Sequence, residues 1–296
     1  MKILITGGTG FIGSALCSRL VASGSYDVTV LSRSPHNVKP PLRAITDLAK
    51  LDSDVVIDVV INLAGEPIAD KRWSALQKQR IMSSRIEATQ QLIKFFKRVE
   101  LKPRVLINGS AIGYYGIGQS SVAIGEDSTG DSSFSSQLCQ QWESVAMQAE
   151  LIGIRTCLLR TGIVLGKGGG ALAKMLLPFK MGLGGKIGNG KQWMSWIHLD
   201  DLVGIILFCM EDEHVKGAVN GTAPNPVTNA VFTKMLGKVL QRPTFIPMPA
   251  FVVKLLMGQM GEELLLSGKK VVPTKALASG YSFKYSDVEE ALDNAV

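Results

Sequence analysis

Short apolar runs alternate along the chain with longer segments whose apolar residues recur every three or four positions. Residues 3–5 form the first apolar run, and residues 11–20 follow with the apolar spacing of a helix. The same pattern predicts strands at 28–31, 55–63, 105–108 and 155–159, and helices at 74–97 and 132–150. This alternation predicts an α/β fold with a parallel sheet and helices on both faces, doubly wound by right-handed crossovers.

A glycine-rich turn joins the first predicted strand to the first predicted helix. Gly7, Gly10 and Gly13 have the spacing G-x-x-G-x-x-G. Glycine permits the tight turn and lets the backbone approach a pyrophosphate, while the helix start at Phe11 and Ile12 offers free N–H groups. The strand before and the helix after are the context that this motif requires. The sequence therefore predicts a Rossmann-type dinucleotide site, and a plain strand-to-helix turn is the alternative.

The pattern loosens after residue 162. A glycine-rich stretch at 166–190 contains a helical segment at 171–179, and a strand-like piece at 193–197 and a helix at 201–210 follow. We predict a dinucleotide-binding domain at 1–162 and a smaller mixed α/β region at 163–296 that covers the substrate and cofactor end of the sheet. A late strand near 218–220 could return to the main sheet.

Composition narrows the possible functions. The net charge is +7, but Lys and Arg are spread along the chain without a basic run, which argues against nucleic acid as a partner. The chain contains no apolar run of about 18 residues and no cleavable signal peptide, so we expect a cytoplasmic protein with no membrane partner. Four scattered cysteines and three scattered histidines predict free thiols and no metal site. The oligomeric state stays open.

The end of the second predicted strand bears on the choice of cofactor. An acidic residue there binds the adenosine ribose of NAD, whereas arginine suits the 2′-phosphate of NADP. Here the strand is followed by Ser32 and Arg33, with no carboxylate. A hydroxyl and a planar guanidinium fork favour a phosphate, so NADP(H) is the predicted cofactor. A surface arginine in a loop is the alternative.

Several segments resemble a known superfamily. Together with the glycine turn, residues 62–65 (Asn-Leu-Ala-Gly) and 197–202 (Ile-His-Leu-Asp-Asp-Leu) resemble the extended short-chain dehydrogenase/reductases, the NAD-dependent epimerase/dehydratase group. Residues 66–68, 72–73, 84–86, 113–116, 165–170 and 184–188 resemble an atypical subfamily of epimerase family proteins. We expect Leu63, Ala64, Gly65 and Val164 to line the cofactor. The resemblance also places Arg85 near the cofactor phosphates, with a solvated helix arginine as the alternative.

The resemblance implies a catalytic serine and a Tyr-x-x-x-Lys pair, in which lysine lowers the pKa of the phenol for acid–base work. Ser110 lies where the serine is expected, although a turn serine at a strand end is an equal reading. The pair itself is missing. The tyrosine position holds Phe134 or Ser135, and the lysine position holds Leu138 or Cys139.

Other residues could take over the proton transfer. Tyr114 or Tyr115 could act as the acid, and two packing tyrosines are the alternative. Cys139 is a weaker candidate, because a buried helix thiol without an adjacent base is inert. The segment around His198 is interpreted as a helix start with Asp200 as its N-cap.

Two functions fit these features. The first is an NADP(H)-dependent, epimerase-family oxidoreductase that acts on a small polar, nucleotide-sugar-like carbonyl or alcohol, with Ser110, Tyr115 and Tyr114 as catalytic residues. The second is a non-catalytic NADP(H)-binding sensor or regulatory protein.

Overall fold

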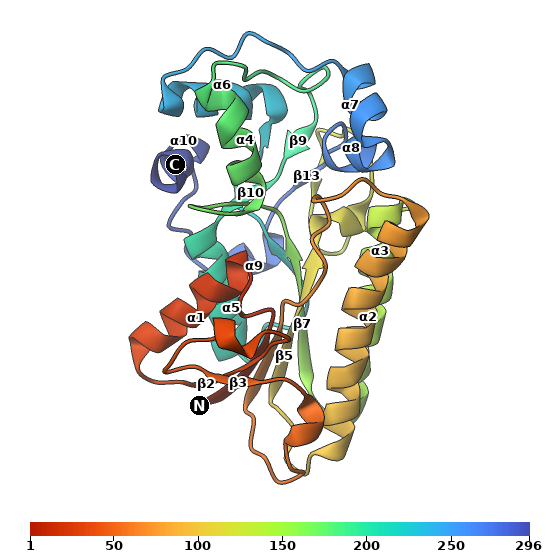
Figure 1. Ribbon diagram of the computed structural model, residues 1–296, viewed down its shortest axis with the longest axis vertical. Coiled ribbons are helices and arrows are strands. Elements are labelled where there is room, and N and C mark those ends of the chain that lie inside the picture. The colour runs from red at the N-terminus through yellow and green to blue at the C-terminus, as the bar shows by residue number, and fades with distance from the viewer.

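Seven parallel strands form the central sheet in the order β11-β7-β5-β4-β1-β2-β3 (Figure 1). The computed structural model describes residues 1–296. The strands are β1 (Lys2–Thr6), β2 (Asp27–Leu31), β3 (Arg43–Ile45), β4 (Val59–Asn62), β5 (Val105–Ala111), β7 (Arg155–Thr161) and β11 (Gly217–Gly221). The order steps away from β1 in both directions, so the predicted Rossmann-type doubly wound sheet is confirmed.

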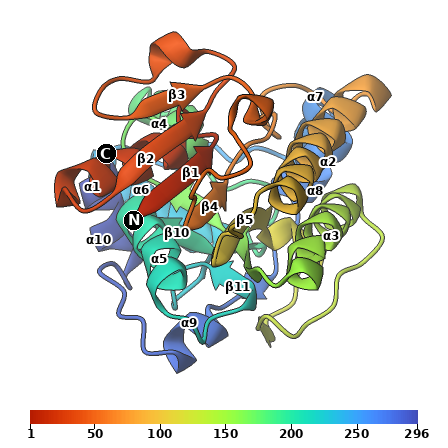
Figure 2. The same ribbon diagram turned by 90° about the horizontal axis from the view of Figure 1, so that it is seen from below.

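Helices cover both faces of this sheet (Figure 2). On one face lie α1 (Phe11–Ser23) and α5 (Leu199–Glu211), and on the other lie α2 (Ala75–Arg98) and α3 (Phe134–Ala146). Side chains of β1 alternate between the two cores: Ile3 and Ile5 pack with α1 and α5, whereas Leu4 packs with α2. Because both faces are buried at the centre of the sheet, β1 and β4 are apolar at successive positions, which is why their sequence pattern is strong.

The C-terminal half adds smaller elements above the carboxyl ends of the strands. Its helices are α4 (Gly170–Lys180), α6 (Asn229–Leu240), α7 (Ala250–Met257), α8 (Gln259–Leu264), α9 (Thr274–Ala278) and α10 (Val288–Ala295). Three two-stranded sheets pair β8 (Ile163–Leu165) with β10 (Trp196–His198), β9 (Trp193–Met194) with β12 (Val227–Thr228), and β6 (Ala123–Ile124) with β13 (Lys270–Val271). No helix is both long enough and apolar enough to cross a membrane.

Residues on both sides of position 162 share one core. β11 pairs with β7 at the edge of the main sheet, as the late strand near 218–220 suggested. Leu202, Ile206 and Val219 pack in the same cluster as Ile3 and Ile107. A second core, around Trp196 and Phe232, belongs to the C-terminal region alone.

Two of the predicted sheet strands differ most in length from those in the structure. The run at 55–63 forms a strand only over Val59–Asn62, because β1 offers partners from Ile3 to Thr6 and the Asp58 carboxylate accepts from the Lys2 backbone N–H at 2.6 Å. The run at 105–108 continues to Ala111, because β7 pairs with it up to Thr161. Ser110 therefore lies within β5 and not after it.

The N-cap of α5 also differs from the prediction. His198 occupies this position, and its Nδ1 accepts the Asp200 backbone N–H at 3.1 Å. Asp200 lies inside the first turn, where a carboxylate still favours the positive end of the helix dipole. The helix begins earlier than expected because β10 runs directly into it.

Candidate functional site

The glycine turn leaves the N-terminus of α1 open. Gly7 has φ +71°, and a Cβ there would lie 2.6 Å from the Leu63 carbonyl oxygen, while a Cβ on Gly13 would lie 2.1 Å from the Gly7 oxygen. These two glycines are therefore required by the packing of the chain itself. Gly10 has an ordinary φ of −80° and is exposed at the N-cap position. The helix has no side-chain cap and no acidic residue in its first turn, so its N–H groups are available to an anion.

The end of β2 lies beside this turn, because Thr6 is the register partner of Leu31. Ser32 is buried, and its hydroxyl oxygen accepts the Ser34 backbone N–H at 3.1 Å, which leaves the hydroxyl hydrogen free to donate. Arg33 is exposed and belongs to none of the ion pairs of the protein. An unpaired guanidinium and an uncapped helix start are both groups that suit a phosphorylated ligand.

The segment after β4 closes against the glycine turn. The backbone N–H of Ala64 donates to the Thr6 hydroxyl at 3.2 Å, and that of Leu63 donates to the Thr6 carbonyl. Gly65 is covered by the guanidinium of Arg85, whose Cζ lies 2.8 Å from where a Cβ on Gly65 would be. Leu63, Ala64 and Gly65 thus lie at the same edge of the sheet as the turn.

Arg85 is neither a solvated helix arginine nor free to extend outward. It donates to the carbonyl oxygens of Glu66 and Ile81, each at 3.0 Å, and its guanidinium lies 5.2 Å from the Trp142 ring. Burial lowers the pKa of Arg85. Its bonds hold the segment after β4 against α2.

The first turn of α1 also meets the C-terminal region. The Phe11 ring lies against the glycine-rich loop that follows β8, close to where a Cβ on Gly169 or Gly170 would be. The carbonyl oxygen of Val164 borders the same Gly170 position, while its side chain is buried with α1 and α5. Phe11, its half-buried neighbour Ile12 and Val164 are therefore brought together with the turn.

A buried polar network braces the carboxyl ends of the central strands. Thr6 donates to Oδ1 of Asn62 at 2.5 Å, and the Asn62 amide donates to Thr89 and to Asn108. Trp142 of α3 donates its indole N–H to the same Thr89 hydroxyl. These bonds fix the ends of β1, β4 and β5 relative to α2 and α3, so the site is held on a rigid frame.

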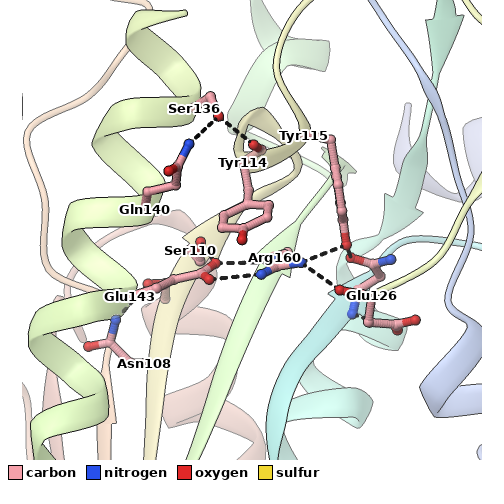
Figure 3. Close-up of polar contacts among 11 residues, drawn as sticks. Asn108, Ser110, Tyr114, Tyr115, Glu126, Ser136, Gln140, Glu143 and Arg160 are labelled. Carbon is pink, nitrogen blue, oxygen red and sulfur yellow. Dashed lines mark hydrogen bonds and ion pairs between the residues drawn. The ribbon is translucent and has the colours of Figure 1, made fainter. Parts of the chain in front are cut away.

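Ser110 belongs to a second buried cluster (Figure 3). Its hydroxyl donates to Oε1 of Glu143 at 2.6 Å, and the Glu143 carboxylate forms a two-point ion pair with Arg160, with both contacts at 2.9 Å. The Arg160 and Glu143 side chains are only 5% and 7% exposed. Burial disfavours the guanidinium charge, but the bonds to Glu143 outweigh it and the pKa of Arg160 is raised.

The two tyrosines occupy different environments. Tyr115 is fully buried, donates to Oδ1 of Asn220 at 2.7 Å and accepts from Arg160 at 3.0 Å, and burial raises its pKa. The Tyr115 hydroxyl therefore has a hydrogen-bond acceptor and a hydrogen-bond donor inside the protein. Tyr114 is half-buried, with its ring 3.4 Å above the Arg160 guanidinium, and no bond is drawn to its hydroxyl (Figure 3).

The start of α3, where the resemblance implies the catalytic tyrosine, is capped by the C-terminal region. Glu263 of α8 accepts the backbone N–H groups of Phe134 and Ser135 and the Ser135 hydroxyl, at 2.7 to 3.2 Å. Cys139 lies deeper in the same helix, and burial raises the pKa of its thiol to about 11. A thiol of that pKa is a poor nucleophile at neutral pH.

The sequence reasoning did not identify Glu143, Arg160 or Asn220. Glu143 lies on the buried face of α3, and Arg160 comes directly after two leucines in a strand. A charged residue within an apolar pattern was therefore the available signal. No group of three or more His, Cys, Asp or Glu side chains is placed to hold a metal ion.

The fold and the open helix N-terminus define a Rossmann-type nucleotide-binding protein, and comparison with known proteins identifies its family. Residues 3–220 match the model of the NAD dependent epimerase/dehydratase family, and residues 248–295 match a domain of unknown function. The chain belongs to the NAD dependent epimerase/dehydratase family.

Full-length relatives support this assignment. The chain is 40% identical to epimerase family protein SDR39U1 of Bos taurus, over 100% of both chains. It is 38% identical to epimerase family protein YfhF of Bacillus subtilis, over 100% of this chain and 98% of that protein. The crystal structure of human SDR39U1 with NADPH is similar at a TM-score of 0.91 and 39% identity, covering 100% of this chain and 99% of that one.

Proposed function

We propose that this protein binds NADP(H) and uses it to reduce a carbonyl group of a small polar substrate, of the nucleotide-sugar kind. The observation that carries the cofactor assignment is the uncapped start of α1 beside the unpaired Arg33. A relative of 39% identity crystallised with NADPH supports the same choice. The chemistry that NADPH supplies when bound is a hydride.

Different residues around the glycine turn would bind different parts of this cofactor. The backbone N–H groups of Phe11, Ile12 and Gly13 would bind the pyrophosphate. Ser32 and Arg33 would bind the 2′-phosphate. The segment from Leu63 to Gly65, together with Val164, would line the remaining surface, and Arg85 would hold that segment in place.

Proton delivery falls to Tyr114. Carbonyl reduction consumes a proton, and the Tyr114 hydroxyl is the phenol that the interior network does not use. Ser110 gives its hydrogen to Glu143, so its free lone pairs suit a hydroxyl or amide donor on the ligand. Tyr115, although predicted as catalytic, would act as a positioning residue beneath Tyr114, since its hydroxyl is bonded to Asn220 and Arg160.

A non-catalytic NADP(H)-binding protein is the second candidate. One observation favours it: the positions of the Tyr-x-x-x-Lys pair are filled by residues that cannot carry out phenolate chemistry, and Glu263 caps the helix start there.

A carbonyl-substrate screen followed by NADPH absorbance separates the two candidates. We expect wild-type turnover, a loss of about 10²- to 10⁴-fold in Tyr114→Phe, as for removal of a general acid, and a clear loss in Ser110→Ala. Tyr26→Phe, which changes a tyrosine directly before the amino end of β2, and Cys139→Ala should keep the activity. Tight NADPH binding without turnover on any substrate would instead establish the non-catalytic protein.

A further inference from the structure

Large apolar side chains are exposed along one edge of the C-terminal region. Phe245 is 86% exposed, and Phe251 and Leu255 of α7 are each 71% exposed. Ile246, Met248, Leu256, Leu177, Met181 and Leu183 are also exposed. Single exposed apolar residues are ordinary, but a contiguous group marks an interaction surface.

These residues lie on two segments, 177–188 and 242–256, which together we define as the docking face. The two segments run side by side, and Met248 forms an isolated β-bridge with Ile187. The Ile246 backbone N–H donates to the Gly184 carbonyl oxygen, and the Arg242 side chain donates to the Lys180 carbonyl oxygen at 3.0 Å. Figure 1 shows the second segment crossing the upper edge of the molecule from α6 to α7.

The charge of this face has a single sign. There is no Asp or Glu at residues 151–199 or at 214–261. Lys180 and Lys186 of this face, and Lys234 of the adjoining helix α6, are exposed and form no ion pair, and Lys254 pairs only with Glu262. Such a surface is complementary to a densely anionic one.

A small cavity lies between two of these lysines. It has a volume of about 180 Å³ and is lined by Lys186, Lys234, Thr233, Thr244, Phe245 and other residues. Thr233 is 3% exposed, and its hydroxyl has no hydrogen-bond partner. An unpartnered buried hydroxyl between two free ammonium groups suits a phosphate group.

We propose that the face formed by residues 177–188 and 242–256 docks on an anionic phospholipid surface. Phe251 and Leu255, one helical turn apart, insert among the head groups together with Phe245, while the lysines bind lipid phosphates and the cavity holds one of them. Apolar insertion combined with basic attraction is the mode by which peripheral helices bind membranes. The protein lies on the membrane without crossing it, which departs from the expectation that it has no membrane partner.

Co-sedimentation of the full chain with vesicles tests this proposal. The probes are phosphatidylcholine vesicles with and without phosphatidylserine, at low and high salt. We expect binding only to the anionic vesicles, weakened by salt. Lys186→Glu and Lys234→Glu should each weaken it about fivefold or more, and Phe251→Ser with Leu255→Ser should nearly abolish it. Leu151→Ser and Lys94→Glu, which change exposed residues elsewhere, should leave it unchanged.

Three results would overturn the proposal. The first is no sedimentation with either vesicle at low salt. The second is self-association that Phe251→Ser abolishes, which would make the face an interface between copies of the chain. The third is stabilisation by inorganic phosphate that needs Lys186, without vesicle binding, which would indicate a soluble phosphorylated ligand.

Discussion

At the scale of single residues, the site divides into positions that spacing predicts and positions that only the fold brings together. Gly7 and Gly10 are predicted from the glycine spacing between the first strand and the first helix. Arg33 is predicted from its place after the second strand. Glu143 and Arg160 come together because α3 packs against the sheet. No short sequence motif indicates this ion pair. The carboxylate of this ion pair accepts the Ser110 hydroxyl, and its guanidinium contacts the Tyr115 hydroxyl and the Tyr114 ring.

The Glu143–Arg160 pair gives a stability prediction. Glu143→Gln removes the carboxylate and leaves the Arg160 guanidinium buried without a counter-charge, so the free energy of unfolding should fall by about 3–5 kcal/mol. Urea denaturation measures the change. Glu87→Gln, an exposed change on α2, is the control and should alter stability by less than about 0.5 kcal/mol. Equal stabilities of the two variants would show that the pair contributes nothing.

At the scale of elements, two helix N-termini have opposite arrangements. The start of α1 has no capping side chain, whereas the start of α5 is capped by the neutral imidazole of His198. The first was predicted from the glycine spacing. The second was not, because Asp200 is the usual capping residue type and only the β10–α5 junction makes His198 the cap.

The open start of α1 can be tested at Gly10. The φ of −80° at Gly10 suits any residue, and a Cβ there would lie 3.2 Å from the Gly7 carbonyl oxygen, so Gly10→Val should fold with only a small local shift. Its side chain would occupy the space of the pyrophosphate and nearly abolish NADPH binding. Fluorescence titration measures the affinity, and Ser18→Val, exposed on the same helix, should bind normally. A folded Gly10→Val protein with unchanged affinity would make the turn purely structural.

The His198 cap predicts a dependence of stability on pH. Burial lowers the pKa of His198 below its ordinary value, so the unfolded chain takes up a proton at a higher pH than the folded one. The free energy of unfolding should therefore decrease as the pH falls below about 6.5. His198→Asn keeps a capping side chain without the titration, so it should flatten this slope between pH 7 and 5.5. The exposed His214→Asn should keep the wild-type slope; identical slopes in all three proteins would contradict the account.

At the scale of the whole molecule, the sequence predicted the central sheet more completely than the contacts between the N-terminal and C-terminal halves of the chain. Strands buried on both faces are apolar at successive positions, so β1, β2, β4, β5 and β7 were readable along the chain. The short edge strand β3 was not predicted, because it is largely exposed and has no such pattern. The capping of α3 by Glu263 joins residues 128 positions apart in sequence, and the apolar face around α7 depends on which helices remain uncovered. Such contacts depend on tertiary packing, which local patterns do not contain.

The C-terminal region completes the site instead of merely covering it. Residues of α5 and β11 complete the hydrophobic core on one face of the sheet. The glycine-rich loop after β8 contacts Phe11, and Glu263 caps the start of α3. The start of α1 has no capping side chain, and the exposed Arg33 belongs to no ion pair. The central claim is therefore that these groups bind NADP(H) and select it by its 2′-phosphate.

Calorimetric titration of the wild-type protein with NADPH and with NADH tests that claim most directly, with Arg33→Ala and the exposed control Arg19→Ala titrated alongside. NADPH should bind more tightly than NADH. Arg33→Ala should lose about 1.5–3 kcal/mol of NADPH affinity, roughly 10- to 150-fold, and keep its NADH affinity, because a charge-assisted pair to the phosphate is removed. Arg19→Ala should behave as the wild type. Equal wild-type affinities for the two cofactors, or an Arg33→Ala protein that binds NADPH as the wild type does, would contradict it.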